Sequence, residues 1–172
     1  MVYLTIIPQV NVVVNGYVVT DNFQKLLHLS QRLIHLYGKP DVVFTANNEH
    51  CIHTAKAVNL MFGVHGIHVI AALHALAPDL DTETFFNNFY QQAEEQSFSH
   101  AVMVLPLLQY AKFRRQAFEI GFCRVNLADS WKNMKNGYQE HLITEDEIES
   151  EPVTSELTDV FLNSLRVEPL VL

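Results

Sequence analysis

The amino-terminal residues alternate between short apolar runs and turn signals. A β-branched run over 2–7 ends at Pro8, and a valine-rich stretch over 10–19 follows it. Asn15-Gly16 interrupts that stretch, and this dipeptide is the typical two-residue turn of a β-hairpin. The pattern therefore predicts a first strand followed by a hairpin.

The rest of the pattern alternates between helix-length segments and short apolar runs. From Thr20-Asp21, which offers an N-cap, apolar residues recur at helical spacing until Gly38 ends the segment. The later expected elements, in order, are a strand over 41–44, a helix capped by Asn47 or Asn48 that runs to Gly63, a strand over 67–72, a helix over 79–96, a strand over 101–105, a helix that begins at Pro106 and a strand over 121–128. Strands that alternate with helices predict an α/β fold of three layers, with a mainly parallel sheet between helices.

The composition changes near residue 143. Residues 145–151 carry five carboxylates, and the segment 155–165 beyond Pro152 has an apolar stripe at helical spacing, formed by Leu157, Val160, Phe161 and Leu165. We therefore expect a domain over 1–143 and an acidic tail over 144–172. A short helix is marginal alone, so the tail helix should pack on its own domain or on a second copy of the chain.

Composition and charge exclude several classes of protein. The chain has 172 residues, 49% of them apolar, and a formal net charge of −8, which together favour an ordered domain over a disordered chain. Nucleic acid and anionic membrane surfaces would be repelled by this charge. Only Cys51 and Cys123 are present, and no cationic residue precedes Lys25, so we expect a cytoplasmic protein without a signal peptide or a disulfide framework. The longest uninterrupted apolar run, over 101–108, is far shorter than the roughly 20 residues that cross a bilayer.

Residues 41–58, Asp-Val-Val-Phe-Thr-Ala-Asn-Asn-Glu-His-Cys-Ile-His-Thr-Ala-Lys-Ala-Val, resemble a signature of the histidine phosphatase superfamily. In that family a strand ends in Ser-Ser-Pro, and an arginine, three residues and Thr-Ala on a helix follow. Thr54-Ala55 and the preceding strand match this order. The resemblance implies a phosphoglycerate mutase-like fold.

The family's catalytic residues are replaced wherever the resemblance aligns them. The family's first histidine and its companion arginine stand in an Arg-His-Gly motif, which aligns with Ile7-Pro8-Gln9. Its second phosphate-binding arginine aligns with His50, its proton-donating acid with a position near Ala75, and its second histidine with Pro106. Phosphoryl transfer needs a nucleophilic imidazole, a cationic cage and an acid for the leaving oxygen. The resemblance thus implies a fold without its family's chemistry, and we expect no cofactor.

Two groups of histidines leave alternatives open. His50 and His53 lie three residues apart near a helix start, with Cys51 between them, so they could form a metal site or an altered phosphate site, or only a solvated helix end with a buried thiol. Because no third ligand has a diagnostic spacing, we predict no metal. His74 follows the expected strand over 67–72 and could act as a replacement base or be structural.

The leading hypothesis is a non-catalytic protein that binds a partner protein or a small ligand. Its vestigial pocket would be formed by Ile7, Pro8, His50, His53, His74 and Pro106. One alternative is a phosphomonoesterase or other hydrolase with a relocated site that uses His50, His53 or His74. Another is a structural subunit of an oligomer, since the tail ends in the apolar residues 170–172. The sequence has no glycine-rich nucleotide loop.

Overall fold

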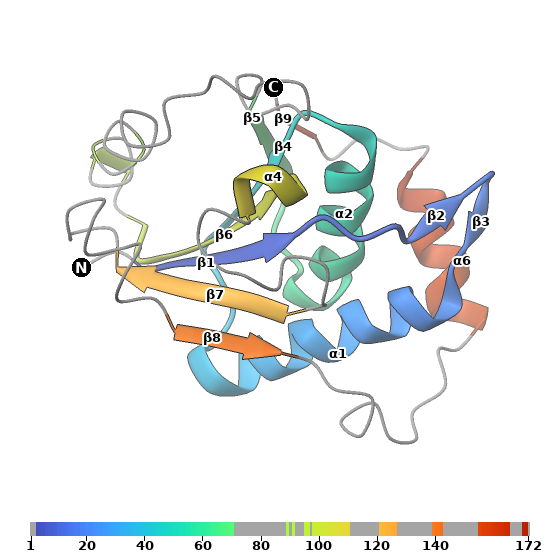
Figure 1. Cartoon of the computed structure of the whole chain (residues 1–172), viewed down its shortest axis with the longest axis horizontal. Helices are drawn as coiled ribbons and strands as arrows, with labels where there is room; N and C mark the ends of the chain where they lie inside the picture. The colour runs from blue at the N-terminus through green and yellow to red at the C-terminus, as the bar shows by residue number, and fades with distance from the viewer. Residues whose placement is uncertain are drawn as a thin grey trace.

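The computed structural model describes residues 3–70, 89, 91, 95–96, 98–110, 121–126, 139–142, 155–165 and 170–171. Its elements, in chain order, are β1 (Tyr3–Pro8), β2 (Val13–Val14), β3 (Tyr17–Val18), α1 (Thr20–Tyr37), β4 (Val42–Ala46), α2 (Glu49–Phe62), β5 (Ile67–Ile70), β6 (His100–Leu105), α4 (Leu107–Tyr110), β7 (Gly121–Asn126), β8 (Gln139–Leu142), α6 (Ser155–Ser164) and β9 (Leu170–Val171). Figure 1 shows their arrangement around the central sheet.

The main sheet has seven strands in the order β8-β7-β1-β6-β4-β5-β9. Pairing is parallel from β1 through β6 and β4 to β5, and β9 adds to β5 in the same direction. Strands β7 and β8 are antiparallel and close the other edge. The expectation of a mainly parallel α/β sheet with flanking helices is confirmed.

The β2–β3 hairpin turns at Asn15-Gly16, as the sequence predicts. Asn15 has φ 51° and Gly16 has φ 80°, the left-handed conformations that a type I′ turn requires at both central positions. The expected N-cap of α1 is wrong. Val19 occupies that position without a side-chain cap bond, and Thr20 is already helical.

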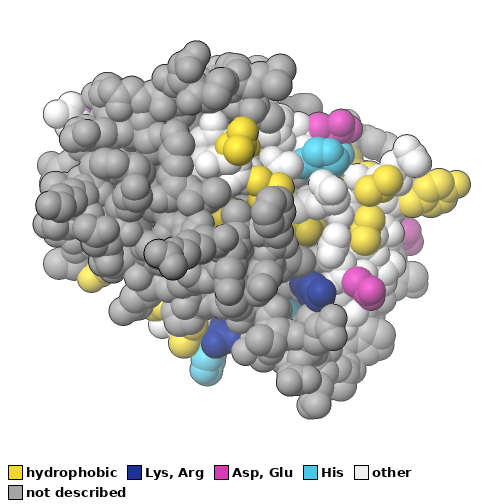
Figure 2. All heavy atoms as spheres, viewed as in Figure 1, with side chains coloured by type: hydrophobic (Ala, Val, Ile, Leu, Met, Phe, Trp, Pro, Cys, Tyr) yellow, Lys and Arg dark blue, Asp and Glu magenta, His cyan; other side chains and the backbone are white. Residues whose placement is uncertain are grey.

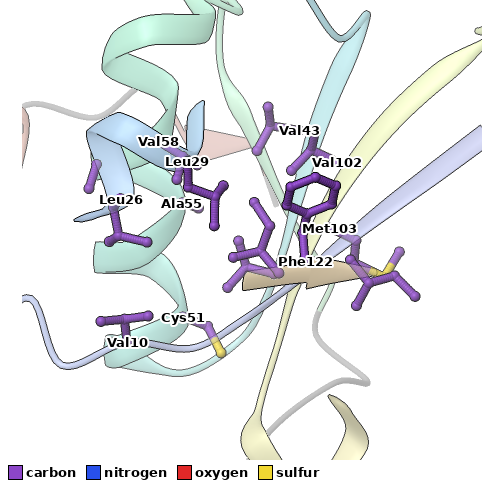
Figure 3. Close-up of a cluster of buried hydrophobic side chains, with 14 of the residues drawn as sticks. Val10, Leu26, Leu29, Val43, Cys51, Ala55, Val58, Val102, Met103 and Phe122 are labelled. Atoms are coloured by element: carbon purple, nitrogen blue, oxygen red, sulfur yellow. The ribbon is translucent and has the colours of Figure 1, made fainter. Parts of the chain in front are cut away.

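The core lies between the sheet and the helices. The residues of β6 are all buried because this strand is central and both of its faces are covered, which explains the continuous apolar run over 101–105. Leu26 and Leu29 of α1 and Ala55 and Val58 of α2 belong to the same buried cluster, part of which Figure 3 shows.

The tail helix α6 packs on the domain. Phe161 is fully buried, and its ring centroid lies 4.8 Å from that of Phe23 in α1. Lys56 of α2, which is only 5% exposed, donates from Nζ to the carbonyl of Ser164 at 2.9 Å. The prediction that the tail helix docks is thus confirmed, and the docking surface belongs to its own domain. The short strands β8 and β9 were not predicted.

Some expectations fall on residues that the structure does not describe. The helix expected over 79–96 is described only at residues 89, 91, 95 and 96, all of which are helical. His74, Ala75 and the acidic run over 145–151 lie outside the described residues. Within the described part of the chain, no helix is both long and apolar enough to cross a membrane.

Candidate functional site

The carboxyl ends of the parallel strands meet at one edge of the sheet. Pro8, the last residue of β1, pairs with Leu105, the last residue of β6, and the Gln9 backbone N–H donates to the Leu105 carbonyl at 2.9 Å. Strand β4 ends beside them, because Thr45 pairs with Val104. Open α/β sheets bind ligands at this kind of edge, so we take it as the candidate site.

Helix α2 begins at this edge, directly after β4. The side-chain oxygen of Asn48 accepts a hydrogen bond from the Cys51 backbone N–H at 2.8 Å, so Asn48 is the N-cap of α2. The backbone N–H of Asn48 donates to the Ala46 carbonyl at 3.0 Å. The turn between strand and helix is therefore tight, and it places the first residues of α2 at the carboxyl edge.

Thr54 ties the segment that follows β1 to α2. The Val10 N–H donates to Thr54 Oγ1 at 2.9 Å. The Thr54 hydroxyl lies 3.0 Å from the Val10 carbonyl oxygen and 2.7 Å from that of His50, and its single proton serves one of these acceptors at a time. Thr54 thus has a structural role that fits its place in the Thr54-Ala55 motif, where Ala55 is fully buried.

Three side-chain nitrogens near the start of α2 are buried and make no hydrogen bond within the protein. They are Asn48 Nδ2, His50 Nδ1 and His53 Nδ1. His53 Nε2 lies 3.9 Å from Glu49 Oε1, one turn earlier on the exposed side of the helix. The pKa of His53 is lowered, chiefly by burial, and the Glu49 carboxylate partly opposes that shift. A lowered pKa keeps His53 neutral at pH 7, so one of its ring nitrogens remains an acceptor.

Cys51 lies between the two histidines but is not placed to act as a nucleophile. Burial raises the pKa of its thiol to about 12, so the sulfur is protonated at neutral pH. Its Sγ lies 3.9 Å from Oε1 of Gln9. Within the described residues, no group of three or more His, Cys, Asp or Glu side chains could hold a metal ion.

The structure brings together part of the set predicted from the sequence. Pro8 is the last residue of β1, Pro106 directly follows β6 and His50 is the second residue of α2, so all three lie at the carboxyl edge. Pro8 and Pro106 are buried and His50 is half-buried. The fully buried Ile7 side chain belongs to the core cluster. His74, the sixth member of the set, lies outside the described residues.

Two polar residues at this edge were not singled out for function in the sequence. Gln9 approaches the Cys51 thiol, and Asn48 carries one of the unpartnered nitrogens. Asn48 was identified only as an alternative N-cap. The sequence did offer a reason to single out Asn48 for function. An asparagine that caps a helix with its side-chain oxygen still has an amide nitrogen, and this nitrogen needs a hydrogen-bond partner of its own.

Comparison with known proteins finds similarity only among solved structures. No protein-family model and no curated protein matches the chain. One similar structure is assigned as the phosphohistidine phosphatase SixA from Agrobacterium tumefaciens, with a TM-score of 0.48 and 11% identity over 83% of this chain and 96% of that chain. Another is phosphoglycerate mutase from Plasmodium falciparum, with a TM-score of 0.42 and 9% identity over 90% of this chain and 97% of that chain.

Proposed function

We propose that this chain is a binding protein that keeps the architecture of the histidine phosphatase superfamily without its phosphoryl-transfer chemistry. The residues at the ends of β1 and β6 support the proposal. Pro8 and Pro106 stand there, and proline has neither a side-chain nucleophile nor a proton to donate. The ends of two adjacent strands thus offer no group that could take up a phosphoryl group.

The nearest nucleophilic atom does not replace the missing imidazole. Cys51 is fully buried, and its raised pKa leaves it as a thiol. His50 stands where the family places an arginine, and a single imidazole supplies neither the fixed charge nor the five donors of a guanidinium. Loss of residues that act as a unit in catalysis removes the mechanism as a whole.

The observation that carries the binding proposal is the set of unpartnered nitrogens on Asn48, His50 and His53. A buried polar atom without a partner costs about 1–3 kcal/mol, so such atoms are rare in folded proteins. Here three such nitrogens lie within six residues, at the edge where this type of sheet binds ligands. A ligand bound there can form hydrogen bonds with them. The ligand would be a small molecule or a protein segment with oxygen acceptors, because Asn48 Nδ2 can only donate.

A titration followed by NMR tests the proposal. The side-chain nitrogen signals of His50, His53 and Asn48 would be followed while acetate, acetamide and inorganic phosphate are added in turn. We expect acetate or acetamide to shift all three residues together and to leave exposed His35 on α1 unchanged. Equal shifts at His35 and at the three site residues, or no shift with any probe, would contradict the proposal.

One observation favours a relocated hydrolase as the second candidate. The lowered pKa of His53 keeps its imidazole neutral at pH 7, which is the protonation state that a general base requires. Hydrolysis of a phosphomonoester that is lost in His53→Ala would favour this candidate over the binding protein.

A further inference from the structure

One end of the molecule combines exposed apolar side chains on two elements that are far apart in the sequence. Tyr17 is 78% exposed and Val14 is 46% exposed on the β2–β3 hairpin, and Val160 is 51% exposed on α6. Figure 1 shows the hairpin and α6 at the same end of the molecule, and in Figure 2 apolar side chains project at the place of the hairpin. We call the surface formed by residues 11–22 and 155–165 the hairpin end.

The hairpin is held firmly at its base, so its exposed tip has a fixed position. Val12 is fully buried, and its carbonyl accepts from the Val19 N–H at 2.8 Å. The Asn22 side chain donates to the Asn11 carbonyl at 2.9 Å. Tyr17 and Val14 therefore project from a fixed turn and not from a free loop.

Helix α6 is fixed beside the same region by its inward face. Phe161 packs on Phe23, which lies one turn into α1, directly after the hairpin. Leu157, one turn before Phe161, is half-buried against the core. Because successive helical residues point about 100° apart, the burial of Phe161 turns Val160 outward.

The hairpin end is acidic as well as apolar. Asp21, Glu156 and Asp159 are exposed, and residues 11–22 and 155–165 include no lysine or arginine. The nearest cation along α1 is Lys25, which is half-buried one turn after Asp21. The hairpin end thus combines three exposed apolar side chains with three exposed carboxylates, two of them on α6 with Val160 and one in the first turn of α1, directly after the hairpin.

We propose that the hairpin end docks a cationic amphipathic segment of a partner protein. Apolar residues of such a segment would cover Tyr17, Val14 and Val160, while its lysines and arginines would face the carboxylates. Charge complementarity of this kind favours one class of partner and excludes others. A second copy of the chain has the same acidic surface and the same net charge of −8, so it would be repelled. The proposal is independent of the proposed function, because it uses none of Asn48, His50 and His53.

The test uses a fluorescently labelled amphipathic helix of lysine and leucine, and a matched peptide in which glutamate replaces lysine. Binding to the full-length protein would be followed by fluorescence anisotropy. We expect the Tyr17→Ser/Val160→Ser variant to bind the lysine peptide about tenfold more weakly than the wild type, a change of about 1.4 kcal/mol. The matched control is Leu36→Ser/Leu108→Ser, which removes two side chains that are 45% and 65% exposed on other elements.

Further outcomes decide the proposal. The control variant should bind like the wild type, and Asp21→Asn/Glu156→Gln/Asp159→Asn should weaken binding and reduce its salt dependence. Circular dichroism and thermal unfolding would show that each variant is folded. Equal weakening by the two double variants, equal affinity for the two peptides, or no binding would overturn the proposal. A dimer of the wild type that Tyr17→Ser dissociates would also overturn it, in favour of a second copy.

Discussion

Lys56 and Ser164 link the core of the domain to the carboxyl-terminal helix. The buried ammonium group of Lys56 in α2 donates to the Ser164 carbonyl at 2.9 Å, in the last turn of α6. Carbonyls in the last turn of a helix lack partners within the helix, and a cation there also interacts favourably with the helix dipole. A side chain 108 residues away in the sequence thus caps the tail helix.

The first prediction concerns this cap. Lys56→Met keeps an apolar side chain of similar length but removes the donor, so the Ser164 carbonyl loses this hydrogen bond. We expect the free energy of unfolding in urea to fall by about 1–3 kcal/mol. Lys25→Met, at a half-buried position of α1, should change it by no more than about 0.5 kcal/mol. Equal effects of the two variants would contradict a capping role.

The second prediction concerns the docking of α6. Phe161→Ala should lower the free energy of unfolding by about 3–5 kcal/mol, because the ring is fully buried against Phe23. Val160→Ala, at the adjacent exposed position, should have a much smaller effect. Truncation after residue 143 removes α6 and β9 together and should lower the melting temperature. If the truncated protein has the same melting temperature as the full chain, the tail contributes nothing to stability.

The third prediction concerns pH. Hydrogen bonds from the backbone N–H groups of Ser99 and His100 hold the pKa of Asp41 below its ordinary value of 3.8. Because the folded state favours the carboxylate, this stabilisation is full above the unfolded pKa and is lost as the pH falls through the lower folded pKa. We expect Asp41→Asn to be less stable than the wild type at pH 6, and the difference to shrink as the pH falls below about 3.8. Urea unfolding at several pH values measures this difference, and a constant difference would contradict the assignment.

The fourth prediction concerns phosphate. The backbone N–H groups at the start of α2 can attract an anion, but the chain has a net charge of −8 and no arginine at the carboxyl edge among its described residues. We expect inorganic phosphate to bind no more tightly than roughly millimolar, or about −4 kcal/mol. Calorimetry measures the affinity, with Asn48→Ala as the variant that alters the helix start. Micromolar affinity would show that another cation completes the site.

Local sequence signals predicted much of the fold. Asn15-Gly16 determines the hairpin because both residues must adopt positive φ, and Asn48 caps α2 as one of two predicted alternatives. Thr20 was misassigned as a cap because capping preferences do not distinguish a residue just before a helix from one just inside it. The strand β9 has two residues, which is too few to show a period, so its pairing with β5 could not be predicted.

The candidate site could be predicted only in part. The order of strands and the resemblance placed Pro8, His50 and Pro106 at one edge, since the carboxyl ends of parallel strands share it. Which polar atoms lack partners could not be predicted, because this depends on the packing of side chains in three dimensions. The unpartnered nitrogens of Asn48, His50 and His53 therefore emerged only from the structure.

Hydrolysis of p-nitrophenyl phosphate by the purified protein tests the central claim most directly. His50→Ala/His53→Ala would serve as the matched variant, and acid-labile phosphohistidine would be measured on the same samples. We expect no turnover above background and no phosphohistidine in either protein, because the resemblance aligns the family's two histidines with Pro8 and Pro106, which have no nucleophilic side chain. Turnover by the wild type that is lost in the double variant would contradict the claim and place a working active site at the start of α2.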